Sequence, residues 1–377
     1  MRFIATCKLG LESTVSFQLK KLNIEVEKTL DARVFFKGDY HTMARALLWL
    51  RSAERVLLEV GSFRANSFDE LFEGTKALNW RDYIRPDSAI HVNGKSAKSG
   101  LFSVSDCQRI VKKAIADKVK ASYGLKNLSE SGGEVIVEVG MLRDEATLAL
   151  DCCGAGLSRR GYRTFNVPAP LSETLGAGII LLSSFFPDTP LIDPMCGSGT
   201  MPIEAAMIAQ NRAPGLNRSF AAESWAFLPK DAFKLAREEA QDGIINRPVQ
   251  ILGSDIDAHN IELCKKHAKK AGVMLNWAVR PVEELTTEWR NGVIVCNPPY
   301  GERMMRPSEA VKLYGTMRRV FDSLPDWQVN IISAMRDFEK AYGKRADRRR
   351  KLSNGGMVCT LYRYFAKRGG KNGNQEE

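Results

Sequence analysis

Residues 191–200 read Leu-Ile-Asp-Pro-Met-Cys-Gly-Ser-Gly-Thr, and residues 201–207 continue as Met-Pro-Ile-Glu-Ala-Ala-Met. The apolar start is typical of a buried strand, and the continuation has the composition of a helix. Between them, Gly197, Ser198 and Gly199 permit a tight turn and a close approach of the backbone to a ligand. A strand, a small-residue loop and a helix in this order indicate a nucleotide-type site, in which N–H groups at the helix N-terminus bind a carboxylate.

Two later stretches also end an apolar run in polar residues. Residues 249–257 read Val-Gln-Ile-Leu-Gly-Ser-Asp-Ile-Asp, so that a predicted strand delivers Asp255, an acid suited to hold two ribose hydroxyls. Residues 293–300 read Val-Ile-Val-Cys-Asn-Pro-Pro-Tyr, a second buried strand that ends at a proline-stiffened corner. The order and spacing of the three stretches favour a doubly wound α/β fold with a functional corner at 297–300.

The corner itself offers hydrogen-bond acceptors and a flat ring. Because Pro298 and Pro299 have no backbone N–H, the carbonyl groups beside them are not tied up by an ordinary turn. The amide oxygen of Asn297 adds an acceptor, and Tyr300 adds a face on which a planar ring can stack. An exocyclic amine fits these groups, since its two N–H groups can donate to the Asn297 amide and the Pro298 carbonyl. Its lone pair is then aimed at an electrophile. An Asn-Pro dipeptide alone more often marks a simple turn, and the two upstream stretches favour the functional interpretation.

These stretches together resemble the class I methyltransferases that use S-adenosylmethionine, over roughly residues 165–365. The Asn-Pro-Pro-Tyr corner is similar to that of the subset that methylates exocyclic amines of adenine, cytosine or guanine. The resemblance implies that Asp193, Gly197 and Gly199 line the methionine end of the cofactor and that Asp255 binds its ribose. Many relatives place an acid near the adenine after the third strand, whereas residues 279–284 read Val-Arg-Pro-Val-Glu-Glu here. The expected cofactor-binding set also includes Cys196, Thr200, Asp257 and Glu283.

Length and composition describe an ordinary globular protein of more than one domain. The chain has 377 residues, of which 44% are hydrophobic, enough for two or more cores. The first ten residues contain no apolar block long enough for a signal peptide, and no later segment reaches membrane-spanning length, so we expect a cytoplasmic protein. The eight cysteines are scattered without a Cys-x-x-Cys pair, and there are only four histidines. This pattern favours reduced thiols and gives no indication of a metal site.

The formal net charge of +11 is concentrated near the end of the chain. Residues 340–371 contain eleven Lys and Arg residues against a single acid, Asp347. A solvated basic tail is the alternative interpretation, but an acidic partner, and nucleic acid in particular, is favoured.

The first 155 residues predict a separate α+β region. Strand-like and helical runs alternate in residues 1–60, with a helix expected over 40–54, and residues 1–44 are assigned to a ferredoxin-like region. A strand at 89–92, a loop at 93–100 and a helix over about 105–122 follow. Lysines in the loop and basic residues on one helix face are suited to phosphate contacts, although such a face is often merely solvated. These residues are Lys95, Lys98, Arg109, Lys112 and Lys113.

Residues 45–155 resemble the THUMP domain at the front of RNA-modifying enzymes, which implies an RNA partner. Glycines and prolines in residues 152–173 predict a hinge before a methyltransferase domain over 165–377. Arg160 in the hinge and Arg303 after the Asn-Pro-Pro-Tyr corner are placed to meet RNA phosphates. Residues 215–248 read as an insertion, in which Trp225 and Phe227 are expected to fill core.

A THUMP-like region before Asp-Pro-Met-Cys-Gly-Ser-Gly-Thr and Asn-Pro-Pro-Tyr-Gly-Glu-Arg resembles the bacterial guanine-N2 methyltransferases of large-subunit ribosomal RNA. The expected partner is therefore RNA, ribosomal RNA first. Three alternatives stay open: a transfer RNA guanine methyltransferase, a DNA adenine-N6 methyltransferase and a non-catalytic RNA-binding protein. A nicotinamide dehydrogenase ranks below them, because residues 197–200 lack the third glycine of its fingerprint.

Overall fold

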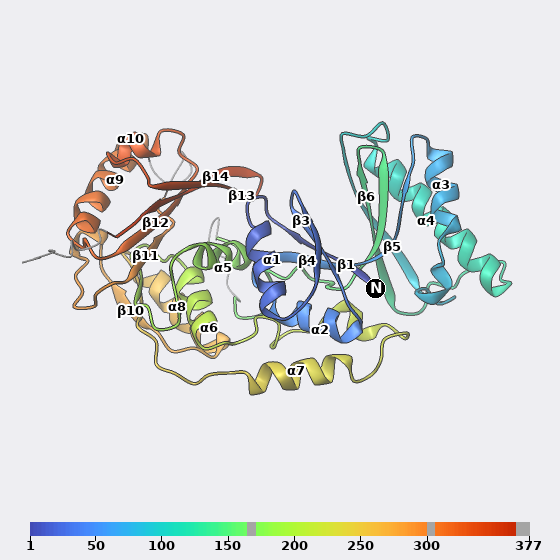
Figure 1. Cartoon of the computed structure of the whole chain (residues 1–377), viewed down its shortest axis with the longest axis horizontal. Coiled ribbons are helices and arrows are strands. Elements are labelled where there is room, and N and C mark those ends of the chain that lie inside the picture. The colour runs from blue at the N-terminus through green and yellow to red at the C-terminus, as the bar shows by residue number, and fades with distance from the viewer. Residues whose placement is uncertain (164–170, 300–305, 367–377) are drawn as a thin grey trace, which may run out of the picture. The chain divides into compact units, whose positions relative to one another are not determined.

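The computed structural model of the chain describes residues 1–163, 171–299 and 306–366. They form two compact units, which are described separately (Figure 1). Unit 1 comprises Met1–Cys7, Val15–Leu157 and Arg218–Glu239, and unit 2 comprises Lys8–Thr14, Ser158–Asn217 and the chain from Ala240 onward.

Unit 1 is built on one seven-stranded sheet with the order β2-β3-β1-β4-β7-β6-β5. The long strand β4 pairs antiparallel with β1 and with β7, so it joins the ferredoxin-like strands to the remaining three in a single sheet. Only β5 and β6 pair in parallel within this sheet. The strands are β1 (Arg2–Cys7), β2 (Val26–Leu30), β3 (Arg33–Lys37), β4 (Ala53–Arg64), β5 (Ala89–Ala97), β6 (Glu134–Leu142) and β7 (Glu145–Asp151).

The helices of unit 1 begin and end at recognisable capping residues. Asp39 caps α2 by accepting from the N–H of Thr42, and α4 ends at Gly124, whose φ of +65° a glycine adopts without strain. Helices α3 and α4 lie side by side over the β5–β6 part of the sheet (Figure 1). The helices are α1 (Glu12–Lys21), which spans residues of both units, α2 (Tyr40–Trp49), α3 (Phe68–Ala77) and α4 (Val104–Tyr123).

Two boundary predictions in this region are wrong. The helix expected over 40–54 ends at Trp49, because Ala53 already pairs with Cys7 of β1. The loop expected over 93–100 is a strand as far as Ala97, because its backbone continues the parallel ladder to Leu142 of β6. The helix expected over 105–122 is confirmed as α4.

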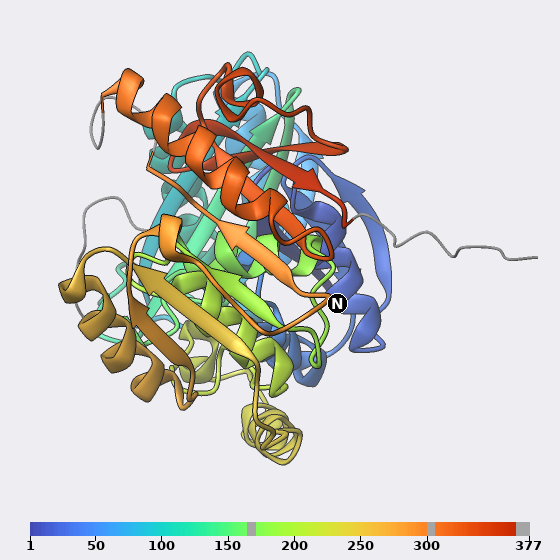
Figure 2. The same cartoon turned by 90° about the vertical axis from the view of Figure 1, so that its left-hand side faces the viewer.

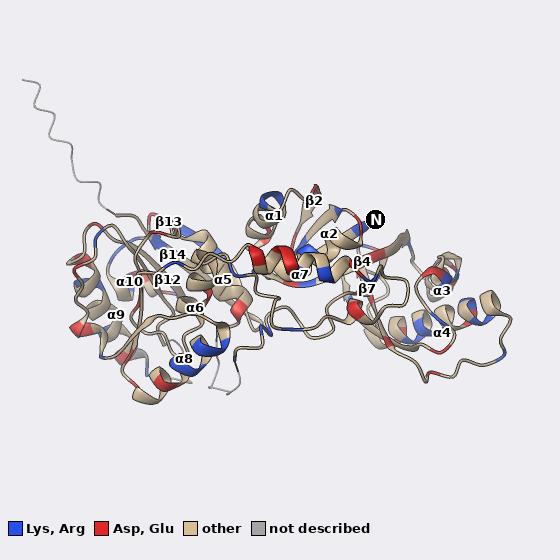
Figure 3. Cartoon of the chain, turned by 90° about the horizontal axis from the view of Figure 1, so that it is seen from below, with Lys and Arg blue, Asp and Glu red and all other residues tan. Residues whose placement is uncertain are grey.

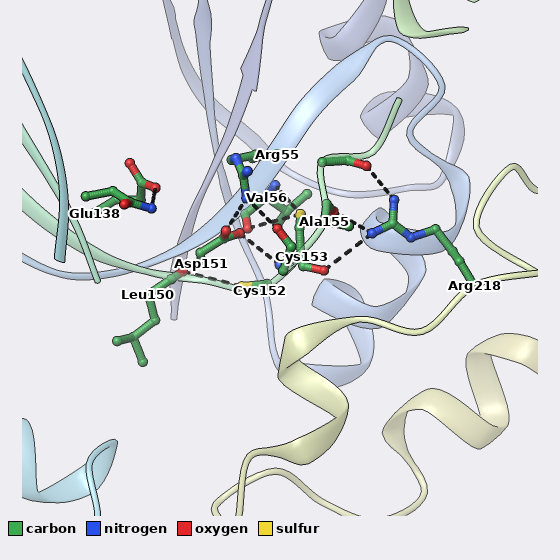
Figure 4. A network of polar contacts seen from close by, with 12 residues as sticks. Arg55, Val56, Glu138, Leu150, Asp151, Cys152, Cys153, Ala155 and Arg218 are labelled. Carbon is green, nitrogen blue, oxygen red and sulfur yellow. Dashed lines mark hydrogen bonds and ion pairs between the residues drawn. The ribbon is translucent and has the colours of Figure 1, made fainter. Parts of the chain in front are cut away.

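The segment 218–239 lies with unit 1, although it falls between two strands of unit 2 in the sequence. The guanidinium of Arg218 donates to the carbonyl oxygens of Gly156 (2.6 Å) and Ala155 (2.5 Å). Figure 4 shows it directed toward the chain at Cys153 and Ala155. Close by, Arg55 pairs with the buried carboxylate of Asp151. The two contacts of Arg218 use backbone carbonyl groups that would otherwise hydrogen-bond to water.

Aromatic packing anchors the same segment. Trp225 is buried, as expected of a core residue, and stacks on Phe227 with ring centroids 5.1 Å apart. Phe227 is only half-buried. Phe227 also contacts Tyr40 and Tyr83 of unit 1. Of the insertion predicted at 215–248, the part from Arg218 to Glu239 therefore belongs to unit 1.

Unit 2 is a mixed sheet with helices on both faces (Figure 2) and the order β10-β9-β8-β11-β12-β14-β13. Neighbouring strands pair in parallel from β10 to β12, and β14 pairs antiparallel with both β12 and β13. The predicted doubly wound α/β fold is confirmed. The strands are β8 (Leu191–Asp193), β9 (Ile251–Asp255), β10 (Asn276–Val279), β11 (Val293–Cys296), β12 (Gln328–Ser333), β13 (Arg348–Asn354) and β14 (Met357–Tyr364). The helices are α5 (Glu173–Leu182), α6 (Thr200–Ala209), α7 (Ala232–Asp242), which also spans both units, α8 (Ala258–Ala271), α9 (Pro307–Asp322) and α10 (Phe338–Tyr342).

The core of unit 2 explains why the central strands lack alternation. All four residues of β11 and all six of β12 are buried, as expected of strands covered on both faces. Tyr314 and Phe321 of α9 pack with Ile294 of β11 in one apolar cluster. Strands β8 and β11 are neighbours although far apart in the sequence, so the strand order reverses between them. A ligand crevice is expected beyond the carboxyl ends of the strands at such a reversal.

Candidate cofactor and substrate site

The carboxyl ends of β8, β9 and β11 bring the predicted site residues to one edge of the unit 2 sheet. Asp193 ends β8 and Asp255 ends β9, and in the ladder Asp193 stands opposite Gly253 of β9. Asn297 directly follows β11, and β11 pairs with the edge of β8 that β9 leaves free. Three stretches separated by tens of residues thus converge as the sequence predicts.

The loop between β8 and α6 needs its glycines for different reasons. Gly197 has φ +52° and Gly199 has φ +84°, values that other residues adopt only with strain. A Cβ on Gly199 would lie 3.0 Å from the sulfur of Cys264 and from the Trp277 ring. A Cβ on Gly197 would meet nothing within 4 Å, so the space beside this glycine is open to a ligand.

Three side chains on one face of α8 hydrogen-bond to this loop or to Asp255. The amide of Asn260 donates to Asp255 Oδ1 (3.2 Å), and the thiol of Cys264 donates to Gly197 O (3.1 Å). The ring nitrogen Nδ1 of His267 lies 3.1 Å from the carbonyl oxygen of Ser198. Sequence reasoning missed these three residues. Their spacing of four and three residues, which places them on one helix face directly after Asp255, was the available signal.

Asp193 is a buried acid with one oxygen unused. Its Oδ1 accepts from the N–H of Met195 at 3.2 Å, whereas its Oδ2 meets no donor in the described part of the chain. Burial raises the pKa of Asp193 well above its ordinary value, and the nearby charge of Asp255 raises it further. An ammonium group, such as that at the methionine end of S-adenosylmethionine, would satisfy the free oxygen.

Apolar side chains border the ribose acid. Ile256 is 74% exposed and Val279 is 54% exposed, and Val279 stands opposite Asp255 in the ladder between β9 and β10. Exposed apolar groups beside a cofactor loop suit the flat face of an adenine ring. Glu283, another residue of the expected cofactor-binding set, lies exposed in a short 3-10 turn after β10. Asp257 caps α8 by accepting from His259 N (2.8 Å).

The corner after β11 retains two of its expected acceptors. Asn297 Oδ1 is buried and meets no donor among the residues that the structure describes. Pro299 O accepts from the hydroxyl of Tyr314 at 3.0 Å, so this carbonyl is occupied, and Pro298 O has no such bond there. Tyr300 and Arg303 lie outside the described residues.

Arg160 is not a surface residue, so its assignment to RNA binding is wrong. It is 3% exposed, and its Nε lies 3.3 Å from Glu204 Oε1 of α6, which also accepts from Tyr162 (3.1 Å). A charge so deeply buried needs its partner and cannot be spared for a phosphate. Nearby, the guanidinium of Arg163 donates to the hydroxyl of Thr200 (2.5 Å). Thr200, which was predicted to bind the cofactor, is therefore hydrogen-bonded within the protein.

The other predicted RNA-binding residues lie in unit 1. Lys95 is exposed on β5 and Lys98 follows this strand. On α4, Arg109 pairs with Asp106 (2.7 Å) and Lys112 with Glu130 (3.1 Å), while Lys113 lies over the Phe72 ring. Lys and Arg recur along this helix in Figure 3. Exposed ion pairs contribute little to stability and can be exchanged for contacts to phosphate.

The described ranges contain no group of three His, Cys, Asp or Glu residues that could hold a metal ion. None of their helices is both long and apolar enough to cross a membrane. All eight cysteines are buried and free of disulfides.

Models of three known domain families match successive parts of the chain. The RMKL-like methyltransferase domain matches residues 160–363, the RlmL ferredoxin-like domain matches residues 2–57, and the THUMP domain matches residues 65–151. The chain is 43% identical over 369 residues to "Putative RNA methyltransferase YpsC" of Bacillus subtilis (strain 168), covering 97% of this chain and 96% of that relative.

Solved structures match over nearly the whole chain. A Listeria monocytogenes protein, described as a predicted N6-adenine-specific DNA methylase, is 44% identical with a TM-score of 0.91, over 97% of this chain and 96% of its own. A structure described as "SMU.472, a putative methyltransferase complexed with SAH" is 38% identical with a TM-score of 0.92, over 98% of this chain and 99% of its own. The unused Asp193 oxygen and the open space at Gly197 fit the same cofactor. The chain therefore belongs to the RMKL-like methyltransferase family, with ferredoxin-like and THUMP domains before a domain that uses S-adenosylmethionine.

Proposed function

We propose that the protein acts in the cytoplasm and methylates an exocyclic amine of an RNA base. The favoured target is guanine N2 of large-subunit ribosomal RNA. The observation that carries the proposal is that Asn297 Oδ1 is buried and accepts no hydrogen bond from the described residues. Asn297 directly follows β11, which pairs with β8, the strand that ends in Asp193. A buried acceptor without a donor costs free energy, of the order of 1–3 kcal/mol, unless a ligand supplies the donor. An amine is such a donor.

The residues of the corner bind and orient the amine. Asn297 Oδ1 and Pro298 O would each accept one N–H of the amine, which directs the nitrogen lone pair away from both acceptors. The hydroxyl of Tyr314 holds the Pro299 carbonyl and thereby fixes the corner. S-adenosylmethionine would supply the electrophilic methyl group, whose bond to the cofactor sulfur breaks as its bond to the amine nitrogen forms, and the nitrogen would then release one proton to water. Because the amine is neutral and its lone pair is freed by these two contacts, no thiol or acid nucleophile is required.

The cofactor would be held by the residues around the 196–199 loop. Asp193 would face its ammonium group, Asp255 its ribose, and Ile256 with Val279 its adenine. Cys196 lies in the same loop with its sulfur 3.8 Å from that of Cys264. Asp257 and Glu283 flank the predicted ribose and adenine positions and complete the proposed set.

An RNA substrate is supported by the THUMP match and by the basic residues of unit 1. Transfer RNA guanine is the second candidate on the same grounds. DNA adenine would agree with the description of the Listeria relative, but a THUMP domain favours RNA over DNA.

The test is radiolabelled methyl transfer to separated ribosomal RNA, transfer RNA and DNA from a strain that lacks the protein. We expect label in large-subunit ribosomal RNA, and nucleoside analysis should identify N2-methylguanosine. Label in transfer RNA or DNA alone would overturn the ribosomal assignment, and no label in any pool would overturn the activity.

A further inference from the structure

The loop between β5 and α4 displays an aromatic ring to solvent. Phe102 is 83% exposed, more than any other aromatic side chain in the described part of the chain. Its neighbour Leu101 is only 6% exposed and packs into unit 1. A single exposed apolar residue is ordinary, so the significance of Phe102 depends on how the loop holds it and on what surrounds it.

The loop is fixed by a set of hydrogen bonds. Gly100 N donates to Asp144 Oδ1 (2.7 Å), and Asp144 N donates to Ser99 Oγ (2.9 Å). Ser96 Oγ donates to Leu101 O (2.7 Å). The turn between β6 and β7 thus fastens the loop on one side and β5 fastens it on the other. Phe102 is held outward by a defined backbone, and little conformational entropy remains to be lost when a ligand covers it.

Two cations lie on the segments that hold the loop. Lys98 and Arg143 are both exposed, and neither forms an ion pair within the described ranges. Lys95 projects from the opposite face of β5, because its neighbours Gly94 and Ser96 face α4 and the loop. Arg143 donates its backbone N–H to Ala97 O (3.3 Å), which brings the β6–β7 turn next to the end of β5. Of the two acids that follow Arg143, Asp144 is engaged by the loop itself and Glu145 begins β7. Lys98 and Arg143 are therefore available to an anionic partner, in contrast to Arg109 and Lys112 on α4, which are paired.

We propose that Phe102 is a stacking platform for an unpaired RNA base, with Lys98 and Arg143 contacting the phosphates on either side of that base. An exposed, rigidly held ring among unpaired cations is the arrangement by which proteins bind single-stranded nucleic acid. A base inside a duplex has no free face, so the platform would select an unpaired segment. This inference rests on the proposed function, because it takes RNA as the substrate class, and it adds which RNA element unit 1 binds.

The test compares two RNA oligonucleotides of equal length and charge, one with an unpaired segment and one fully paired, bound to the full-length protein. Phe102→Ala should weaken binding of the first by about 5- to 150-fold and leave the second unchanged. Phe102→Trp should restore binding because it keeps a ring, whereas Phe102→Leu should not. The slope of affinity against salt should stay the same in all three variants, because no charge is removed.

The matched control is Phe186→Ala, which removes a ring that is also exposed (67%) but lies two residues before the acid Asp188. It should bind both oligonucleotides like the wild type. Equal binding of the unpaired RNA by wild type and Phe102→Ala would overturn the inference and leave the proposed function intact. Full binding by Phe102→Leu would also overturn it, since any apolar partner, a protein included, would then explain the exposed ring. Failure of the wild type to bind or methylate any RNA would overturn both.

Discussion

The backbone N–H of Gly197 donates to Asp255 Oδ2 at 2.9 Å, so the glycine of the cofactor loop and the acid of the next strand are one hydrogen-bonded unit. The other oxygen of Asp255 accepts from Asp257 N (3.0 Å) and Asn260 Nδ2 (3.2 Å). A carboxylate has about four acceptor sites, and three are used within the protein. Asp255 is therefore oriented before a ribose arrives, with little capacity to spare.

The first prediction follows from this double role. Asp255→Ala should weaken S-adenosylmethionine binding by about 1–3 kcal/mol, because the ribose loses its acceptor and the Gly197 loop loses its tether. Isothermal titration calorimetry measures the affinity, and circular dichroism checks folding. An Asp255→Ala protein that folds and binds as well as the wild type would place the ribose acid elsewhere, with Asp257 as the next candidate.

The second prediction concerns Asp193 and pH in the absence of cofactor. Burial raises the pKa of Asp193 in the folded state above the unfolded value of about 3.9. The folded protein thus holds this proton longer than the unfolded chain does. Its contribution to stability is complete below the unfolded pKa and is lost as the pH rises through the folded pKa.

Asp193→Asn removes that ionisation while keeping an acceptor for Met195 N. Without cofactor its melting temperature should exceed that of the wild type at pH 7–8, and the two should converge near pH 4. The same variant should bind S-adenosylmethionine more weakly, because an amide lacks the charge that faces an ammonium group. Identical melting curves of the two proteins across this pH range would contradict the account of Asp193.

The third prediction tests the phosphate contacts of unit 1. Replacing Lys95, Lys98 and Lys112 together by Ala should weaken RNA binding and reduce the salt slope, by about 0.7–0.9 for each phosphate that the variant no longer neutralises. Cofactor affinity should not change. Lys265 and Lys266 on α8, with Lys270 of the same helix, give a charge-matched control in unit 2. If RNA affinity and slope are both unaltered, the phosphate track lies in the basic residues 345–351 instead.

The strands and loops of unit 2 were predictable because their apolar runs end abruptly in polar residues. Asp193, Asp255 and Asn297 each follow such a run, and parallel strands bring those ends to one edge. Strand β2 and helix α10 were not predicted, since each has only five residues. Helix α3 was also missed, although it buries Leu71 and Thr75, four residues apart, on one face. The long loop predicted after residue 92 was wrong because pairing between strands, which a single sequence does not show, overrides local glycine and lysine content.

Burial was the property that sequence reasoning handled least well. Arg160 lies in an arginine-rich hinge and was expected at the surface, but its partner Glu204 comes from a helix more than forty residues later. His267 was not singled out, because one histidine in an amphipathic helix resembles any other. Its contact to Ser198 O exists only because α8 packs beneath the cofactor loop.

The corner at 297–300 carries the central claim. Asn297→Ala removes the acceptor that matters most as the amine nitrogen turns tetrahedral, so turnover should fall by about a hundredfold or more while cofactor and RNA still bind. The target base must leave its own stack to reach this corner, where it can stack on the ring of Tyr300. Tyr300→Phe should therefore change turnover little because the ring is kept. Tyr300→Ala should lower turnover severely because this stacking, worth about 1–3 kcal/mol, is lost.

The most direct measurement is therefore the single-turnover rate of methyl transfer by Asn297→Ala, on the RNA that the labelling experiment identifies and at saturating cofactor. We expect a rate at least about a hundredfold below wild type, with both dissociation constants near their wild-type values. Methyl transfer by Asn297→Ala at a rate close to that of the wild type would show that Asn297 does not orient the amine.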